Sequence, residues 1–312
     1  MNYLQEIRIL LLEKSYEQDF VKLGERLSSQ GIELLLGLTE EKTGREVPMD
    51  GGMEGREPMG PKCQCGERKD NGRLWITDSS PTAHRLLREG KYVLAFFHKG
   101  NEGKDFSGLK YAIEEPGELD AEYFENTYRR LAGLPWDILE TDRCILRETT
   151  EEDVEAFCEI YADPEVTRYT GAPFSSVEQE KQYVKEYIEK VYAFYNFGVW
   201  TVVRKNTDTV IGRAGFSYRA GFEQPELGFM IGRPWQGRGL AWEVCRAILC
   251  WGREQFGPIE VNAMVRPENN ASLRLCKKLG FVVRETLVWE GQTCLRLSLS
   301  LSDCNFRENA FS

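Results

Sequence analysis

The chain has 312 residues, of which 41% are hydrophobic and 12% aromatic, which is enough apolar material for well-filled cores and too much for a disordered chain. Its length suggests two domains better than one. Its 40 basic and 50 acidic residues give a net charge of −10, which argues against general nucleic-acid binding. The net charge is compatible with a local basic pocket for a phosphorylated cofactor.

The amino-terminal residues predict neither export nor membrane insertion. A short apolar run at 7–12 is flanked by acidic residues and is followed by no small-residue cleavage site, so it indicates a strand. No apolar run reaches the about 18 residues of a membrane span. The nine scattered cysteines are typical of reduced thiols, so we expect a cytoplasmic protein. The pair Cys63 and Cys65 has no second ligand pair nearby, and we expect no metal site.

The first half of the chain alternates apolar strand patterns with helical patterns. Strands are predicted at 6–12, 32–38, 73–79 and 92–98, with a candidate fifth at 109–115, and helices at 16–29, through 84–88 and at 121–133. Unbroken apolar strands between helices indicate a mostly parallel, covered sheet, and hence a doubly wound, Rossmann-like α/β domain over residues 1–139. The Gly-, Pro-, Glu- and Lys-rich stretch 40–72 lacks periodicity and predicts a mobile excursion.

Asp78 is the one residue of this half that suggests chemistry, because it follows an apolar strand where α/β sheets place ligand-binding groups. The stretch TDSSP (77–81) loosely resembles the first strand end of haloacid-dehalogenase-like phosphatases. Those enzymes need a second aspartate two residues on, where this chain has Ser80. We therefore favour a structural or ligand-sensing role over phosphatase activity.

The second half begins after LPWDILETD (134–142), where Pro135 breaks the preceding helix. Its predicted elements are a strand at 143–148, helices at 151–163 and 175–194, strands at 199–205, 210–220 and 226–231, a long helix at 236–256, a strand at 259–265, a helix at 269–280 and a closing hairpin at 281–301. We expect an α+β domain over 140–302, with a tail at 303–312.

The stretch RPWQGRGLAWE (233–243) lies between an apolar strand and the long helix. The first turn of a helix offers free N–H groups and a partial positive charge. Gly237 and Gly239 have no Cβ, so a ligand can lie directly on the backbone, and Arg238 adds a full charge. The arrangement suits a pyrophosphate. The glycines alone favour an ordinary strand-to-helix turn, and the order of a strand, Gln-x-x-Gly-x-Ala and a long helix is the more specific signal.

The spacing Gln236-x-x-Gly239-x-Ala241 is similar to the Q/R-x-x-G-x-G/A signature of the GNAT family of N-acetyltransferases. Residues 141–157 and 267–281, TDRCILRETTEEDVEAF and PENNASLRLCKKLGF, resemble two segments of its RimJ/RimL-like branch. The resemblance covers about residues 140–302, and the first half lies outside it. It implies a mixed sheet whose central strands, 226–231 and 259–265, splay apart.

The resemblance also implies acetyl-CoA as co-substrate. Main-chain atoms of Met230 and Ile231 and the amide of Asn269 would hold the pantetheine arm, although Asn269 can equally cap a helix. The implied cofactor-binding residues are Met230, Ile231, Gln236, Gly237, Arg238, Gly239, Leu240, Ala241, Asn269 and Ser272.

Acetyl transfer to an amine needs a base, an oxyanion donor and a proton for the leaving thiolate. Glu226, at the start of its strand, is the candidate base, and Glu290 in the closing hairpin is its rival. Where many family members carry a tyrosine this chain has Cys276, so Ser272 is the candidate thiolate partner and Cys276 is expected to pack in the core.

The leading hypothesis is an N-acetyltransferase acting on a primary amine, either a small molecule or a protein N-terminus, by direct attack in a ternary complex. The alternatives are an acyl-CoA-binding sensor without turnover and a degenerate phosphatase-like first domain that binds a ligand. Nine aromatic residues between 161 and 197 are expected to serve packing for the most part, and some of them to wall an acceptor pocket.

Overall fold

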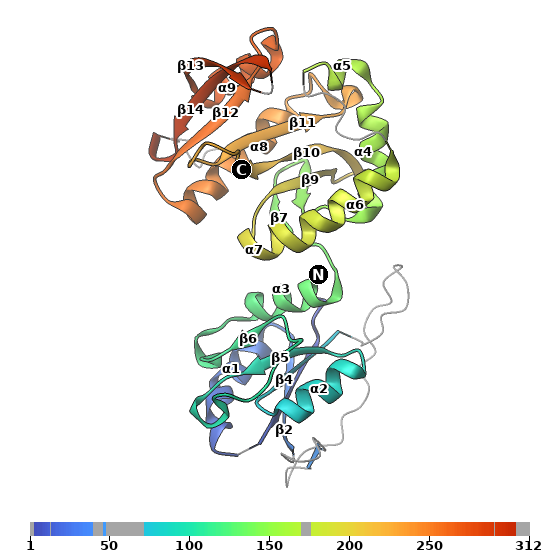
Figure 1. Cartoon of the computed structure of the whole chain (residues 1–312), viewed down its shortest axis with the longest axis vertical. Helices are drawn as coiled ribbons and strands as arrows, with labels where there is room; N and C mark the ends of the chain where they lie inside the picture. Colours follow the sequence, from blue (N-terminus) through green and yellow to red (C-terminus); the bar gives the residue numbers. More distant parts are fainter. Residues whose placement is uncertain are drawn as a thin grey trace. The chain divides into compact units, whose positions relative to one another are not determined.

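The computed structural model describes residues 3–12, 14–39, 46–47, 72–169, 176–289 and 291–303. The chain divides into two compact units, Met1–Leu134 and Pro135–Ser312 (Figure 1). Residues 137–140, expected to belong to the join, form a strand of the second unit's sheet. Nearly all of the stretch 40–72, with Cys63 and Cys65, lies outside the described residues, and so does the tail from residue 304.

The first unit is built on a six-stranded sheet in the order β3-β2-β1-β4-β5-β6, in which every neighbouring pair is parallel except β2 and β3. Its strands are β1 (Glu6–Leu11), β2 (Glu33–Thr39), β3 (Glu46–Val47), β4 (Arg73–Thr77), β5 (Tyr92–Phe96) and β6 (Ala112–Ile113). Its helices are α1 (Gln18–Ser29), α2 (Ser80–Arg88) and α3 (Ala121–Ala132), with 3-10 turns at Lys14–Tyr16, Lys99–Asn101 and Pro116–Glu118. The candidate fifth strand at 109–115 is only two residues long.

Both faces of this sheet are covered, as the unbroken apolar strands predict. Successive residues of a strand point to opposite faces. Ile9 packs in one core with Phe20 of α1 and Phe124 of α3, and the next residue, Leu10, packs in another with Leu86 of α2.

The second unit is built on an eight-stranded sheet in the order β13-β14-β12-β11-β10-β9-β8-β7. Its strands are β7 (Asp137–Glu140), β8 (Cys144–Arg147), β9 (Val199–Arg204), β10 (Thr209–Ser217), β11 (Glu226–Ile231), β12 (Glu260–Val265), β13 (Val282–Trp289) and β14 (Gln292–Ser300). Its helices are α4 (Val154–Tyr161), α5 (Pro164–Thr167), α6 (Val177–Tyr187), α7 (Ala193–Tyr195), α8 (Leu240–Phe256) and α9 (Asn270–Leu279), with a π-helical turn at Ile188–Tyr192 and 3-10 turns at Glu151–Asp153, Arg233–Trp235 and Leu301–Asp303.

The central strands β11 and β12 are parallel, and they separate almost as soon as they meet (Figure 1). Their one register pair is Glu226 with Asn262, whereas β10 follows β11 over six pairs from Glu226 to Ile231. The edge of β11 that faces β12 therefore carries no strand partner from Leu227 onward. The expected splay of the central strands is confirmed.

Helix α8 fills one face of this sheet. Its buried stripe of Leu240, Val244 and Ile248 packs in one core with Ile211 and Ala214 of β10. The charged side chain of the intervening Arg213 points to the other face, where α4 and α6 supply its partners.

The single helix predicted at 175–194 is interrupted by the π-helical turn, and the contacts of two tyrosines give a reason. The Tyr187 hydroxyl accepts from the Val199 N–H at 2.9 Å, and the Tyr192 hydroxyl donates to the Val199 carbonyl at 2.6 Å. Residues five apart share a face of a π-helix but not of an α-helix. The turn thus lets both hydroxyls hold the start of β9.

Candidate active site

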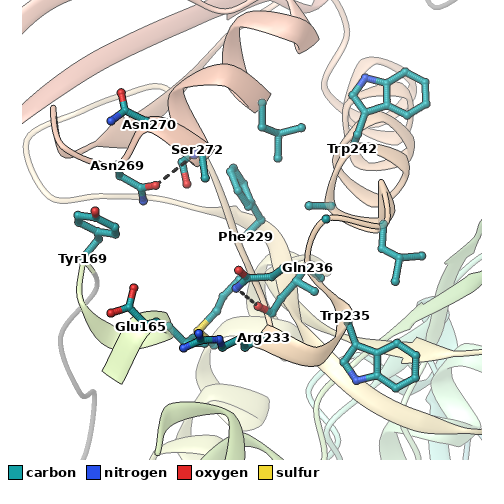
Figure 2. A pocket seen from close by; sticks show the side chains of 18 of the residues that line it. Glu165, Tyr169, Phe229, Arg233, Trp235, Gln236, Trp242, Asn269, Asn270 and Ser272 are labelled. Carbon is teal, nitrogen blue, oxygen red and sulfur yellow. Dashed lines mark hydrogen bonds between the residues drawn. The ribbon is translucent and has the colours of Figure 1, made fainter. Parts of the chain in front are cut away.

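A cavity of about 650 Å³ opens where β11 and β12 have separated (Figure 2). The end of β11, the segment from 233 to 242, helix α5 and the start of α9 line it. Of the ten residues predicted to bind a cofactor, all but Arg238 are among its lining. Those nine are Met230, Ile231, Gln236, Gly237, Gly239, Leu240, Ala241, Asn269 and Ser272.

The loop before α8 presents bare backbone to this cavity. Gly237 and Gly239 have φ of +72° and +77°, a conformation that favours glycine. A Cβ built on Gly237 would meet no atom within 4 Å, so the space above it is open. Among the backbone hydrogen bonds of the described residues, none is donated by residues 237–242. A row of free N–H groups at the positive end of a long helix binds anions.

Polar side chains fix the shape of this loop from behind. The Gln236 amide nitrogen donates to the Ile231 carbonyl at 2.8 Å, so this side chain ties the loop to the strand end. Arg143 donates to the Arg238 carbonyl at 3.0 Å and pairs with Glu243, whose carboxylate also accepts from the Thr141 hydroxyl at 2.6 Å. Although burial acts to raise it, the hydrogen bonds from Thr141 and Arg143 lower the pKa of Glu243 below its ordinary value.

Arg238 itself is directed elsewhere. Its guanidinium lies 5.3 Å from the centroid of the Trp235 ring, a cation–π distance, and it is not among the residues that line the cavity. The loop therefore offers its backbone to the cavity and not this charge.

The start of α9 forms the opposite wall. The Asn269 side chain accepts from the Ser272 N–H at 3.1 Å, so Asn269 is the helix cap that the sequence allowed, and it lines the cavity as well (Figure 2). Ser272 lies in the first turn beside it. Cys276, one turn further on, is fully buried, and burial raises the pKa of its thiol to about 12. Cys276 thus packs in the core, as expected.

Of the two candidate bases, the structure describes Glu226 and does not describe Glu290. Glu226 lies at the point where β11 and β12 meet, outside the cavity lining, and both of its carboxylate oxygens accept from Arg219, one of them at 2.8 Å. The Arg219 guanidinium in turn lies 5.0 Å from the Trp289 ring. Glu290 lies outside the described residues.

Helix α5 and the residues just after it contribute cavity residues that no sequence motif marks. Tyr169 is one of the nine aromatics between 161 and 197; its hydroxyl donates to the Glu268 carbonyl at 3.3 Å, and both residues line the cavity. Trp235 and Trp242 also line the cavity (Figure 2). Both tryptophans flank the motif at 236–241 in the sequence, and this position could have indicated that they line the cavity. Most of the other aromatics in 161–197 pack in the core or on the surface, and Phe174 lies outside the described residues.

Asp78 of the first unit has a supporting role. It is fully buried, and its carboxylate accepts from the Leu12 N–H at 2.8 Å and meets the His98 ring nitrogen at 3.1 Å. The other ring nitrogen of His98 accepts from the Gly100 N–H at 3.0 Å, so the ring donates to Asp78. Burial raises the pKa of Asp78 above its ordinary value. Both oxygens are engaged in holding the ends of β1, β4 and β5 together.

Within the described residues, no three His, Cys, Asp or Glu side chains are grouped so that they could hold a metal ion. No helix there has the length and apolar character needed to cross a membrane.

Comparison with known proteins agrees with this geometry. Residues 143–282, all within the second unit, match the family model described as Acetyltransferase (GNAT) domain. The chain is 31% identical over 150 residues to the uncharacterized N-acetyltransferase p20 of Bacillus licheniformis, covering 46% of this chain and 82% of the relative. It is 35% identical over 147 residues to the uncharacterized N-acetyltransferase YoaA of Bacillus subtilis, again covering 46% and 82%.

A third relative is the [ribosomal protein uS5]-alanine N-acetyltransferase of Escherichia coli, which is 28% identical over 178 residues and is covered to 88% of its length by 52% of this chain. The free N–H groups at the start of α8, the splayed strands and these relatives agree. The chain belongs to the GNAT family of N-acetyltransferases.

Proposed function

We propose that the second unit transfers an acetyl group from acetyl-CoA to a primary amine, by direct attack of the amine in a ternary complex. The observation that carries this proposal is the cavity between β11 and β12, with the bare backbone of residues 237–241 at one side and the cap of α9 at the other. Acyl-CoA binding without turnover is the alternative that an assay with amines would reveal.

The residues present fit coenzyme A. The N–H groups of Gly237 to Ala241 suit a pyrophosphate. The edge of β11 at Met230 and Ile231 has no strand partner and suits the amide groups of a pantetheine arm, and the Ile231 carbonyl there already accepts from Gln236. The Asn269 oxygen is engaged in capping, which leaves its amide N–H groups as donors. When bound, the thioester supplies the activated acetyl group.

For the chemistry we assign roles to two side chains. Glu226 accepts the proton that the attacking ammonium must lose. Because both of its oxygens are held by Arg219 and the carboxylate is 9% exposed, transfer through a water is favoured over direct contact. Ser272 donates a hydrogen bond to the departing sulfur. A backbone N–H near Met230 or Ile231 faces the oxyanion, and Glu290 stays a rival base.

The acceptor is an amine of a small molecule or of a protein N-terminus. The relative that acts on the alanine of ribosomal protein uS5 supports the second class. Glu165 of α5 and Tyr169, two residues after that helix, line the cavity, and we assign them to the acceptor approach.

A binding experiment tests the cofactor site. Gly237→Ala puts a methyl group into the open space above the loop, and we expect the Kd for acetyl-CoA to rise about tenfold or more, the equivalent of about 1.4 kcal/mol. Gly133→Ala is the matched control, since Gly133 has φ of +68° and equally open surroundings but lies in the first unit. If calorimetry gave the two variants equal affinity for acetyl-CoA, residues 233–243 would be an ordinary turn and not a phosphate-binding loop.

For the first unit we propose a Rossmann-like, doubly wound fold with a ligand-binding role. The parallel order β2-β1-β4-β5-β6 supports it, as does a cavity of about 1000 Å³ beside the carboxyl ends of β5 and β6, where such sheets bind ligands. The engagement of Asp78 argues against phosphatase chemistry. We expect no phosphate release from p-nitrophenyl phosphate by the full chain; release that is lost on Asp78→Asn would revive the phosphatase alternative.

A further inference from the structure

Strand β13 is a long edge strand whose outer side has no partner among the described residues. It pairs with β14 alone and forms the end of the eight-stranded sheet (Figure 1). It runs for eight residues, whereas β7 at the opposite edge has four, and the edge strands β3 and β6 of the first unit have two each. The outer N–H and C=O groups of such a long strand can pair with another extended segment.

The charged side chains of β13 do not protect this edge. Natural edge strands commonly carry charges that discourage pairing. Here both charged side chains of the strand bind to their own sheet, since Arg284 donates to the Ser298 hydroxyl at 2.6 Å and Glu285 accepts from Arg296 at 2.6 Å. Both charges are thus engaged within the sheet, and neither repels an approaching strand.

Exposed valines flank the edge on both faces of the sheet. Val282 is 56% exposed, Val283 41% and Val288 72%. Val283 and Val288 lie opposite Leu297 and Thr293 of β14, which are four residues apart, so the two valines point to one face. Val282, directly before Val283, points to the other face. An added strand therefore meets apolar side chains above and below its backbone.

The far end of β13 lies beside the residue that holds the proposed base. The Arg219 guanidinium lies 5.0 Å from the ring centroid of Trp289, the last residue of the strand. Arg219 also pairs with both carboxylate oxygens of Glu226. The ring of Phe222, on the same connection between β10 and β11, lies 6.1 Å from that of Trp289. A segment that runs antiparallel to β13 has its N-terminus at this end of the strand.

The size of the edge favours a substrate segment over a second copy of the chain. The eight residues, with an irregularity of the ladder between Val283 and Glu285, extend over about 27 Å, and a sheet with its side chains is about 10 Å thick. Two copies paired edge to edge would bury roughly 500–600 Å² in total, whereas stable interfaces bury about 1,200 Å² or more. A segment that binds for a single turnover needs no such area.

We propose that β13 is the docking edge for a polypeptide acceptor. The N-terminal segment of the acceptor adds to β13 as an antiparallel strand and places its terminal amine beyond Trp289, towards Glu226. Main-chain hydrogen bonds supply the affinity, and the exposed valines favour β-branched and apolar side chains at alternate positions of the segment. This inference rests on the proposed function and selects the protein N-terminus from its two classes of acceptor.

The test uses the full chain, acetyl-CoA and acceptors that share an N-terminal alanine. They are alaninamide, a nine-residue peptide that continues with threonine, valine and serine, and two forms of this peptide that are N-methylated on alternate sets of amides. We expect kcat/KM for the peptide to exceed that for alaninamide about tenfold or more, the equivalent of about 1.4 kcal/mol. One methylated form loses this advantage and the other keeps most of it, because only alternate residues of an edge strand point their N–H groups at the neighbouring strand.

A substitution on the edge tests the same surface from the enzyme's side. Val288→Asp places a charge beside the added strand, and we expect the ratio of kcat/KM between peptide and alaninamide to fall severalfold. Val21→Asp is the matched control, because Val21 is 50% exposed and lies on α1 of the first unit. This control leaves the ratio at its wild-type value.

The outcomes separate the docking edge from the proposed function. Equal kcat/KM for the peptide and alaninamide, or equal effects of the two methylation patterns, would overturn the docking edge and leave the proposed function intact. A dimer in sedimentation that Val288→Asp dissociates would assign the edge to a second copy and overturn it as well. Absence of transfer to all of these acceptors and to a polyamine would overturn the proposed function itself.

Discussion

Glu226 lies where the two central strands part, and Arg219 holds it there. The carboxylate pairs through both oxygens with a side chain seven residues earlier, on the connection between β10 and β11. A bidentate pair this close holds the carboxylate in one orientation. We propose this oriented carboxylate as the acceptor of the proton that the amine loses.

Replacing Glu226 by glutamine removes the proton acceptor that we propose and keeps the shape of the side chain. We expect kcat to fall about 100-fold or more, with little change in the Kd for acetyl-CoA, because Glu226 lies outside the cavity lining. Steady-state kinetics with a saturating amine measure the first quantity and calorimetry the second.

Glu285→Gln is the control for this variant, since Glu285 also pairs with an arginine of the same sheet, Arg296, at 2.6 Å. A similar loss of kcat in both variants, or none in Glu226→Gln, would contradict the assignment and turn attention to Glu290.

Ser272 is the residue to which we assign thiolate departure, since Cys276 is buried in the core with a raised pKa. Ser272→Ala should lower kcat by about 100-fold, and Ser272→Thr, which keeps a hydroxyl, should retain most of the activity. Thiol release followed by absorbance measures both. Unchanged turnover in Ser272→Ala would remove Ser272 from the mechanism.

At this scale the sequence indicated which residues line the cavity better than what each side chain does. Nine of the ten predicted cofactor residues line it, because a motif fixes backbone positions. The sequence did not predict that Gln236 bonds to its own strand end, or that Arg238 lies over Trp235. These side-chain contacts depend on neighbouring residues that only folding brings together.

At the scale of elements, the loop before α8 is braced by a residue inside the helix. Glu243 fixes Arg143, and Arg143 holds the Arg238 carbonyl of the loop. Because its folded-state pKa is lowered below 4.5, the contribution of Glu243 to stability is fully present above about pH 4.5 and is lost as the pH falls through the folded-state value.

Glu243→Gln should therefore weaken the loop at neutral pH. We expect a free energy of unfolding about 2 kcal/mol lower, the typical loss for a hydrogen-bonded charge, and a several-fold higher Kd for acetyl-CoA. The difference from wild type should shrink as the pH falls below 4.5. Urea unfolding at pH 7 and pH 4 measures it.

Glu254→Gln serves as control for this change, because Glu254 is an exposed glutamate further along the same helix. An equal effect of the two substitutions at both pH values would show that the Arg143–Glu243 brace adds nothing.

The strands and helices with strong periodicity were predictable, and the elements without it were not. Helix α8 was expected from 236 but begins at Leu240, since Gly237 and Gly239 adopt positive φ. Strand β7 and helix α5 are four residues each, too short for a periodic pattern. The π-helical turn at 188–192 follows from what two tyrosines bond, which no local pattern reports.

At the scale of the whole molecule, two units with separate cores share one chain, and the family match falls within the second. The splay of β11 from β12 was expected from the family resemblance and not from the strand patterns themselves. Two parallel strands that separate have the same apolar sequence pattern as two that stay paired. For the first unit no such resemblance was available, and its sheet was inferred from alternation alone.

The most direct test of the account is acetyl transfer by the full chain, followed as amine-dependent release of free coenzyme A thiol and as acetylated product by mass spectrometry. The acceptors are a polyamine, an amino sugar and a peptide with an N-terminal alanine. We predict release with at least one of them, an added mass of one acetyl group on its amine, and a fall of about 100-fold or more in the rate of both signals in Glu226→Gln. Tight binding of acetyl-CoA without amine-dependent release from any acceptor would contradict it and favour a sensor that binds the donor and does not turn it over.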